Sequence, residues 1–427
     1  MKITKANGKA EYALIENLKK RSGETDAKIV DIVTTIINGV KENGDEAVRE
    51  YTVRFDGGLP KKFLIEKDEL QSYLDVVDED FLNAIKRAKD NIYDFHLCQT
   101  QQSWMTTKDS GVIMGQRIRG LERVGIYVPG GTAAYPSSVL MNAIPAKIAG
   151  VKEIVMVTPP GKDGNPNPNI MAAAAVAGVD KVYLVGGAQA VAALAYGTEK
   201  IPKVDKIVGP GNIFVATAKK LLYGIVDIDM VAGPSEILIV ADKIADPSFL
   251  AADLMSQAEH DKMASAILLT TSMELAKATV REIDKQIKYL ERQTIIEESL
   301  DNYGEIIVCE DLEQAIEFAN ELAPEHLELC ITDPLKYIGK VDNAGSVFLG
   351  NWSPEPLGDY YAGPNHVLPT SGTARFFSPL SVDSFVKKSS FIYYTPQELR
   401  KAKDDIIKLA DTEGLTAHAN SIKVRFE

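Results

Sequence analysis

The sequence predicts an α/β protein with two Rossmann-like domains that hold parallel sheets, one inserted in the other, plus small N- and C-terminal segments. The main observation is that short apolar strands alternate with helices twice along the chain, from residue 153 to 240 and from 266 to 349. Strands that are apolar throughout are typical of a parallel sheet with helices on both faces. With 427 residues, the chain is also too long for one small core.

Changes in this pattern set the domain boundaries that we expect. Residues 1–22 form an N-terminal segment, and residues 128–235 form the inserted domain. Residues 23–127 and 236–380 together form the first α/β domain, which is discontinuous. Residues 381–427 form a separate C-terminal tail.

The expected elements follow from hydrophobic spacing, in chain order. Two helical stripes are separated by Gly57 and Gly58. Residues 112–127 resemble a strand pair that turns at Gly120. In the tail, the capping box from Thr395 to Glu398 starts a helix that Gly414 ends. The remaining strands are expected at 153–157, 181–185, 206–208, 237–240, 266–269, 306–309, 327–331 and 347–349, and the remaining helices at 171–179, 188–196, 214–222, 275–290 and 312–322.

Composition and charge exclude several classes of protein. There are 47 basic and 60 acidic residues, which give a net charge of −13 and argue against broad nucleic-acid binding. No apolar run approaches the roughly 20 residues of a membrane span, and the first ten residues lack the apolar core of a signal peptide. Three cysteines, Cys98, Cys309 and Cys330, are too few for a disulfide framework and indicate reduced thiols, most simply buried small side chains. We therefore expect a cytoplasmic protein.

The helix expected at residues 250–261 carries the first candidate metal ligands. Asp246 and Pro247 form a good helix start. Gln257 and His260 are three residues apart, so they share one face of the helix. An amide oxygen and an imidazole can hold a metal, although a solvated polar face explains such a pair equally simply.

The other histidines strengthen the case for a metal. Only five occur, at His96, His260, His326, His366 and His418. Asp359 and His366 lie in a glycine- and proline-rich loop after the strand at 347–349, and such loops often form sites in α/β proteins. Zinc prefers imidazole nitrogen and carboxylate oxygen, which His260, Asp359 and His418 could supply together with Gln257. His96, at the end of a helical pattern, fits a structural or capping role better.

Glu325 and His326 form a candidate acid–base pair. Pro324 ends the preceding helix, so both side chains emerge just before the strand at 327–331. A neighbouring carboxyl and imidazole can transfer protons near neutral pH. A surface pair is the alternative.

Three glycine turns after strands suggest contacts with phosphate or ribose. They are Pro129-Gly130-Gly131, Gly186-Gly187 and Gly209-Pro210-Gly211-Asn212. Small residues let backbone amides approach a ligand at the start of the following helix. None of the three is a GxGxxG fingerprint, so tight strand-to-helix turns remain an alternative.

Taken together, several long stretches in this order closely resemble the histidinol dehydrogenase family. Two positions differ from the usual family residues, Phe214 in place of tyrosine and Met255 in place of leucine, and neither is a proposed ligand or catalyst. The stretches that carry the resemblance are 124–131, 209–212, 232–236, 254–260, 323–328 and 363–370.

The resemblance implies zinc-dependent, NAD-linked oxidation of L-histidinol through L-histidinaldehyde to L-histidine, the last two steps of histidine biosynthesis. It implies one zinc ion per subunit and a homodimer in which the tail, residues 381–427, reaches the partner's active site. The inserted domain, 128–235, would contact NAD. The residues that match the family's functional positions are the catalytic pair Glu325 and His326; the zinc ligands Gln257, His260, Asp359 and His418; the substrate contacts Ser235, His366 and Glu413, besides the zinc ligands and His326; and the NAD contacts Tyr127, Gln189 and Asn212.

Two other functions remain as alternatives from the residues alone. A zinc hydrolase could use the Glu-His pair to activate water, but the glycine turns would then have no purpose. A non-catalytic scaffold would not be stabilised by metal or NAD.

Overall fold

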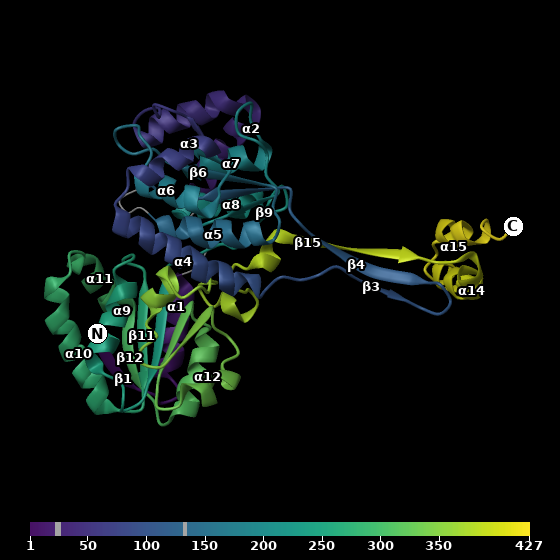
Figure 1. Cartoon of the computed structure of the whole chain (residues 1–427). Helices are drawn as coiled ribbons and strands as arrows, with labels where there is room; N and C mark the ends of the chain where they lie inside the picture. The colour runs from purple at the N-terminus through teal and green to yellow at the C-terminus, as the bar shows by residue number, and fades with distance from the viewer. Residues whose placement is uncertain (22–26, 131–134) are drawn as a thin grey trace.

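Two six-stranded sheets and one antiparallel arm organise the chain in the computed structural model, which describes residues 1–21, 27–130 and 135–427 (Figure 1). In this part of the chain, no helix is both long and apolar enough to cross a membrane. The predicted α/β class, with two Rossmann-like domains, is confirmed.

Sheet A is entirely parallel and carries its helices on both faces. Helices α9 (Pro247–Ala258), α10 (Met273–Gln286) and α11 (Gln293–Tyr303) pack on one face. Helices α1 (Ala10–Arg21) and α12 (Leu312–Leu322) pack on the other. The strand order is β1 (Lys2–Lys5), β12 (Gly304–Val308), β11 (Ser265–Thr270), β10 (Glu236–Ala241), β13 (His326–Cys330) and β14 (Ser346–Leu349).

Sheet B is parallel except for its first edge strand, which runs antiparallel to its neighbour. Helices α2 (Ala27–Asp56), α7 (Gly187–Tyr196) and α8 (Ile213–Leu222) cover one face. Helices α4 (Glu79–Leu97), α5 (Pro136–Ile148) and α6 (Pro168–Ala177) cover the other. The strand order is β2 (Leu64–Glu66), β7 (Lys181–Leu184), β6 (Glu153–Thr158), β5 (Arg123–Tyr127), β8 (Lys206–Val208) and β9 (Asp227–Ile228).

The strand order corrects the predicted domain boundaries. Residues 23–127 were expected to fold with 236–380, but the described elements between residues 27 and 97 pack on sheet B, and β2 and β5 belong to that sheet. The reason is that the stripe from Val33 to Val48 is buried against α7 and sheet B. The N-terminal segment 1–22 is not separate either, because β1 is the edge strand of sheet A. One domain does interrupt the other, but the interrupting unit is larger than residues 128–235.

A three-stranded arm extends from sheet B and carries the C-terminal helices at its far end (Figure 1). Its strands are β3 (Trp104–Thr107), β4 (Ile113–Gly120) and β15 (Val386–Tyr393), and its helices are α14 (Pro396–Thr412) and α15 (Thr416–Lys423). The expected strand pair at 112–127 is therefore wrong, since β4 pairs within the arm while β5 pairs within sheet B. The start of α14 is as predicted, because the Thr395 hydroxyl accepts a hydrogen bond from the Glu398 amide.

A short linker, residues 229–235, determines how the two sheets face each other. It leaves sheet B at the carboxyl end of β9 and enters sheet A at the amino end of β10. The carboxyl edge of sheet B therefore lies close to the amino edge of sheet A, as the contact between Ser138 and His366 shows, and the candidate site lies between these edges, in a space that is called the cleft below. Cys309 and Cys330 are buried as expected, whereas Cys98 is exposed.

Candidate active site

The Glu325–His326 pair stands at the amino end of β13 because the helix before it is forced to stop. Ala323 closes α12 in the left-handed conformation (φ +48°), and Pro324 follows it. Backbone contacts with the first residue of β10 then fix both side chains. The Glu236 amide donates to Glu325 Oε2 at 2.9 Å, and His326 Nδ1 lies 3.0 Å from the Glu236 carbonyl oxygen. Since a carbonyl only accepts, Nδ1 carries a proton, and Nε2 is the ring nitrogen left buried without a hydrogen-bond partner among the described residues.

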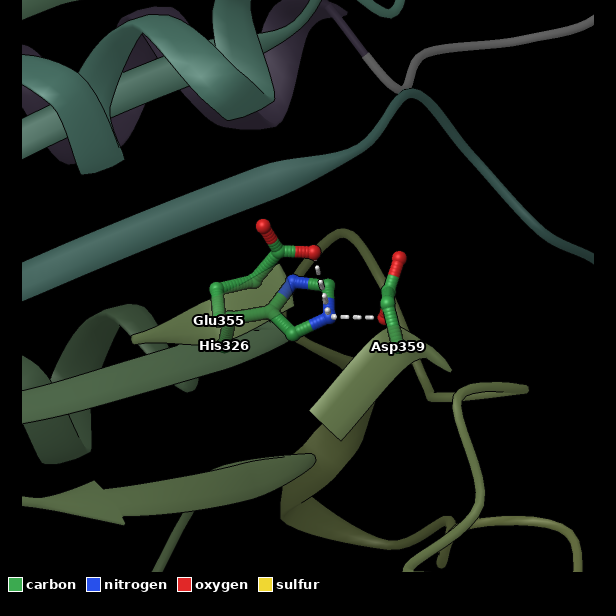
Figure 2. A group of neighbouring side chains, drawn as sticks. All are labelled: His326, Glu355 and Asp359. Carbon is green, nitrogen blue, oxygen red and sulfur yellow. Dashed lines mark ion pairs between the residues drawn. The ribbon is translucent and has the colours of Figure 1, made fainter. Parts of the chain in front are cut away.

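Two carboxylates lie near this imidazole nitrogen. Asp359 Oδ1 is 3.6 Å and Glu355 Oε1 is 3.9 Å from His326 Nε2 (Figure 2). Both acids are on the short helix α13 (Glu355–Tyr360), four residues apart, so they project from the same face. One donor atom from each of the three side chains lies within 4.8 Å of the others.

The pKa shifts in this cluster arise because several carboxyl groups lie close together and are buried from solvent. Burial alone would lower the pKa of His326, but the carboxylates of Glu325, Asp359 and Glu355 raise it to about 10. Burial raises the pKa of Glu325 and of Glu355 to about 8 in each case. The pKa of Asp359 falls to about 2 because hydrogen bonding and charge from His326, with further charge from His366, outweigh its burial. Acids thus outnumber cationic groups here, as expected where a cation binds.

The predicted zinc ligands are only partly brought together. Gln257 is 1% exposed on α9, and its Oε1 has no hydrogen-bond partner among the described residues. The neighbouring Ser256 hydroxyl donates to Glu355 Oε2 at 3.2 Å, which ties α9 to α13. His260 lies just past the end of α9, at the exposed rim, and desolvation lowers its pKa while the charge of Asp359 opposes the shift. A buried amide oxygen without a partner, an imidazole and a carboxylate are a donor set that fits zinc.

The tail residues are far from this cluster within one chain. His418 is on α15 and Glu413 caps α14, both exposed, at the end of the arm (Figure 1). Among the residues that the structure describes, the donor atoms that cluster belong instead to His326, Glu355 and Asp359, and only Asp359 is in the predicted set of four.

Both domains contribute to the surroundings of the cluster. His366 Nδ1 donates to the Asp359 carbonyl oxygen at 2.9 Å, and its Nε2 lies 3.4 Å from the Ser138 hydroxyl at the start of α5. Ser235 is half-buried directly before β10, and its carbonyl accepts from the Ser265 amide at 3.0 Å. His366 thus links the Asp359 backbone to the other domain, and Ser235 directly precedes Glu236, whose backbone holds the Glu325–His326 pair.

His96 has the structural role expected of it. It is fully buried at the end of α4, and its Nδ1 donates to the Ile92 carbonyl oxygen at 2.8 Å. Its Nε2 therefore accepts from Asn365 Nδ2 at 3.3 Å, and the same amide donates to the Met141 carbonyl oxygen at 2.6 Å. His96 and Met141 belong to helices of sheet B, so this network fixes the loop that carries His366 to the other domain.

The predicted NAD contacts gather at the carboxyl edge of sheet B. Tyr127 ends β5, and its hydroxyl accepts from the Gly187 amide at 3.0 Å; burial raises the pKa of Tyr127 to about 12. Gln189, in the first turn of α7, is 1% exposed, yet neither of its amide atoms has a partner in the part of the chain that the structure describes. A buried amide with open hydrogen-bonding capacity is suited to a polar ligand.

Asn212 begins α8 beside them. Its Oδ1 accepts from the Phe214 and Val215 amides at 3.0 and 3.2 Å, so Asn212 is an exposed N-cap residue whose amide nitrogen is not used in these bonds. Gly131, the last residue of the first glycine turn, lies outside the described residues. The strand order reverses between β5 and β8, and ligands of open parallel sheets bind at such a switch point.

Sequence reasoning missed Glu355, Glu236 and Ser138. Glu355 stands between two prolines, which suggests a turn, although its spacing of four from Asp359 places the two acids on one helical face. Glu236 contributes mainly its backbone, which no sequence pattern reveals. Ser138 becomes a neighbour of His366 only through domain packing.

Comparison with known proteins gives one consistent result. Residues 19–426 match the family model described as histidinol dehydrogenase. Histidinol dehydrogenase of Clostridium acetobutylicum is 60% identical over 412 residues, 96% of each chain, and that of Bacillus cereus is 54% identical over 427 residues, 100% of this chain and 99% of the other. A crystal structure of histidinol dehydrogenase from Elizabethkingia anophelis superposes with a TM-score of 0.93 at 40% identity, covering 100% of this chain and 98% of that one.

Proposed function

This chain belongs to the histidinol dehydrogenase family, and from that premise we propose zinc-dependent oxidation of L-histidinol through L-histidinaldehyde to L-histidine, with two NAD⁺ reduced. It is a dehydrogenase of histidine biosynthesis. The family favours this reaction over the zinc hydrolase considered from the sequence.

The observation that carries the proposal is the orientation of His326. Its Nδ1–H is committed to the Glu236 carbonyl, so Nε2 is the atom that meets a substrate in the cleft. The carboxylates around His326 raise its pKa, and the positive charge of a metal ion bound among them would lower it again. With Nε2 unprotonated, His326 accepts the hydroxyl proton there while the substrate carbon loses its hydride, and it acts again as base in the second oxidation. NAD⁺ supplies the hydride acceptor for both oxidations.

Glu325 has a different role in this scheme. Its Oε2 is held by the Glu236 amide at the buried edge of the cleft, and burial raises its pKa to about 8. A carboxyl with a pKa near neutrality suits the transfer of protons to and from water. Glu325 therefore deprotonates the water that hydrates the aldehyde before the second oxidation.

Gln257, His260 and Asp359 would hold the zinc ion, together with His418 of a second subunit. When bound, zinc orients the imidazole and amino nitrogens of the substrate. The unpartnered Gln257 Oε1 supports this assignment, as does the place of Asp359 in a cluster whose donor atoms are close enough to hold a metal ion. His366 and Ser235 orient the substrate from the sides of the cleft, with Glu413 from the partner.

The nucleotide occupies the carboxyl edge of sheet B in this proposal. Tyr127, Gln189 and Asn212 lie on either side of the switch point between β5 and β8. Few charged side chains are needed there, since amides and helix starts can hold a dinucleotide.

The stoichiometry of the reaction tests the proposal as a whole. We expect two NADH per histidinol consumed, measured by absorbance and chromatography, with about one zinc per chain in the same sample. Hydrolysis of an acyl substrate without NADH would instead favour the hydrolase, and full turnover by rigorously metal-free protein would remove the zinc assignment.

A homodimer with shared sites explains the arm. Glu413 and His418 lie at its end, exposed, where a second subunit could receive them. Mixing inactive His418→Ala chains with inactive His326→Ala chains should restore about a quarter of wild-type activity, because random pairing makes half of the dimers mixed, each with one intact site. No recovery after verified subunit exchange would contradict the shared site.

A further inference from the structure

A buried ion pair lies beneath the turn that carries Asn212. Lys219, on α8, pairs with Asp229, the first residue after β9. The two side chains are only 5% and 1% exposed. The function proposed above does not use either of them.

Both members of the pair bind the backbone of a single residue, Gly209. Lys219 Nζ donates to the Gly209 carbonyl oxygen at 2.9 Å, and the Gly209 amide donates to Asp229 Oδ2 at 2.8 Å. The other carboxylate oxygen, Oδ1, accepts from the Met230 amide at 2.7 Å. Gly209 has a φ of +108°, and a Cβ there would collide with the Tyr127 carbonyl oxygen. The turn at Gly209 thus packs closely against the end of β5, and the ion pair binds its backbone.

Stability alone does not explain such a pair. Removing two charges from water is costly, and well-packed apolar side chains of similar size often stabilise a protein equally well. What charges add is direction, because one donor and one acceptor fix the orientation of the Gly209 peptide groups. Asn212 follows three residues later and begins α8, so its direction depends on that of Gly209.

We propose that Lys219 and Asp229 are positioning residues for the dinucleotide, holding the turn from Gly209 to Asn212 in the orientation that binds NAD⁺. This inference depends on the proposed function, which assigns NAD⁺ to that edge. Asp229 is also the first residue of the linker to β10. The ion pair therefore connects the turn from Gly209 to Asn212 with the segment that enters the amino edge of sheet A.

The test uses the full-length zinc-loaded protein and three variants: Lys219→Met, Asp229→Asn and the double variant Lys219→Met/Asp229→Leu. The double variant removes the charges without leaving either one unpaired. We expect KM for NAD⁺ and the Kd for NAD⁺ from equilibrium titration to rise at least about tenfold, since small misplacements of binding groups have effects of this size. KM for histidinol and the zinc content should stay within about twofold of the wild type.

Lys206→Met is the control, because the Lys206 side chain is also buried and ion-paired, with the exposed Asp227, but lies at the opposite end of β8. It should leave KM for NAD⁺ unchanged. A folded double variant with wild-type KM and Kd for NAD⁺, an equal rise in both KM values, or a double variant that does not fold would overturn the inference. Wild-type protein that forms no NADH from histidinol would refute the proposed function, and the Kd for NAD⁺ would then decide this inference separately.

Discussion

The two edges that border the cleft are built in opposite ways. The amino edge of sheet A presents buried ionisable side chains, with His326 and Glu325 fixed by the backbone of Glu236. The carboxyl edge of sheet B presents glycine turns, helix starts and amides, such as Gln189 and Asn212. The first arrangement is suited to moving protons, and the second is suited to holding an extended polar ligand.

This difference shows that a parallel sheet does not fix which of its edges is used. Open α/β sheets generally bind ligands beyond the carboxyl ends of their strands, and the nucleotide site proposed for sheet B follows that rule. Sheet A does not, because the short linker from β9 can enter β10 only at its amino end. The orientation of the second domain therefore follows from chain connectivity.

The largest expected effect is the loss of the base at the catalytic edge. His326→Asn keeps a donor for the Glu236 carbonyl but removes the nitrogen at the Nε2 position. We expect kcat to fall about 10²–10⁴-fold for both histidinol and histidinaldehyde, with little change in NAD⁺ affinity. Steady-state kinetics with each substrate and an NAD⁺ titration test this. A variant that lost NAD⁺ binding to the same extent would contradict the division between the two edges.

Glu325→Gln should divide the two oxidations. The amide oxygen can still accept from the Glu236 amide, so the geometry is retained while the carboxylate is lost. Because Glu325 is proposed to act on water, we expect a loss of about 10²-fold in aldehyde oxidation and less than about tenfold in alcohol oxidation. Single-turnover measurements of NADH formation from each substrate distinguish the two. Equal losses would reject the separate roles of Glu325 and His326.

The sequence predicted most strands and helices between residues 153 and 349, because long apolar periodicity is a local property, but it missed β9 (Asp227–Ile228) and α11 (Gln293–Tyr303). It did not predict which sheet the helix from Ala27 to Asp56 covers, since an amphipathic stripe shows that a face is buried but not against what. For the same reason the strand at 113–120 was assigned to the wrong neighbour.

The site shows the same limit. Glu325, His326, Asp359 and His366 were recognisable because glycine and proline neighbours mark them in the sequence. In the structure the carboxyl groups of Glu325 and Asp359 lie beside the His326 imidazole, and His366 contacts the backbone of Asp359. Glu355 joins them only because α13 turns back toward β13. His418 lies at the end of an arm that leaves its own domain, so the zinc ligation proposed for it requires a second subunit.

A smaller effect is expected at the nucleotide edge. Gln189→Leu removes two buried amide atoms that have no partner among the described residues, so the free energy of unfolding should stay equal or rise slightly. If the amide binds NAD⁺, KM for NAD⁺ should rise about tenfold with little change in KM for histidinol. Thr217→Val is the control. Thr217 lies on α8, and its buried hydroxyl also has no hydrogen-bond partner among the described residues. It should leave KM unchanged. A wild-type KM for NAD⁺ in Gln189→Leu would remove Gln189 from the nucleotide site.

The smallest effect is expected where the two domains are joined. Burial lowers the pKa of His96 in the folded protein, so the unfolded chain binds a proton there first as the pH falls. Its contribution to stability is therefore complete above about pH 6.5 and is lost as the pH falls toward the lower folded-state pKa. His96→Gln should destabilise the protein by about 1–2 kcal/mol at pH 8 through the weakened contact with Asn365, and should reduce the slope of stability against pH between 6.5 and 5. Urea unfolding at several pH values measures both.

His366, whose pKa is also lowered by burial, remains in the variant, so the slope should decrease without vanishing. An unchanged slope of unfolding free energy against pH would contradict this account. It would mean that protonation of His96 does not destabilise the contact with Asn365 that holds the two domains together.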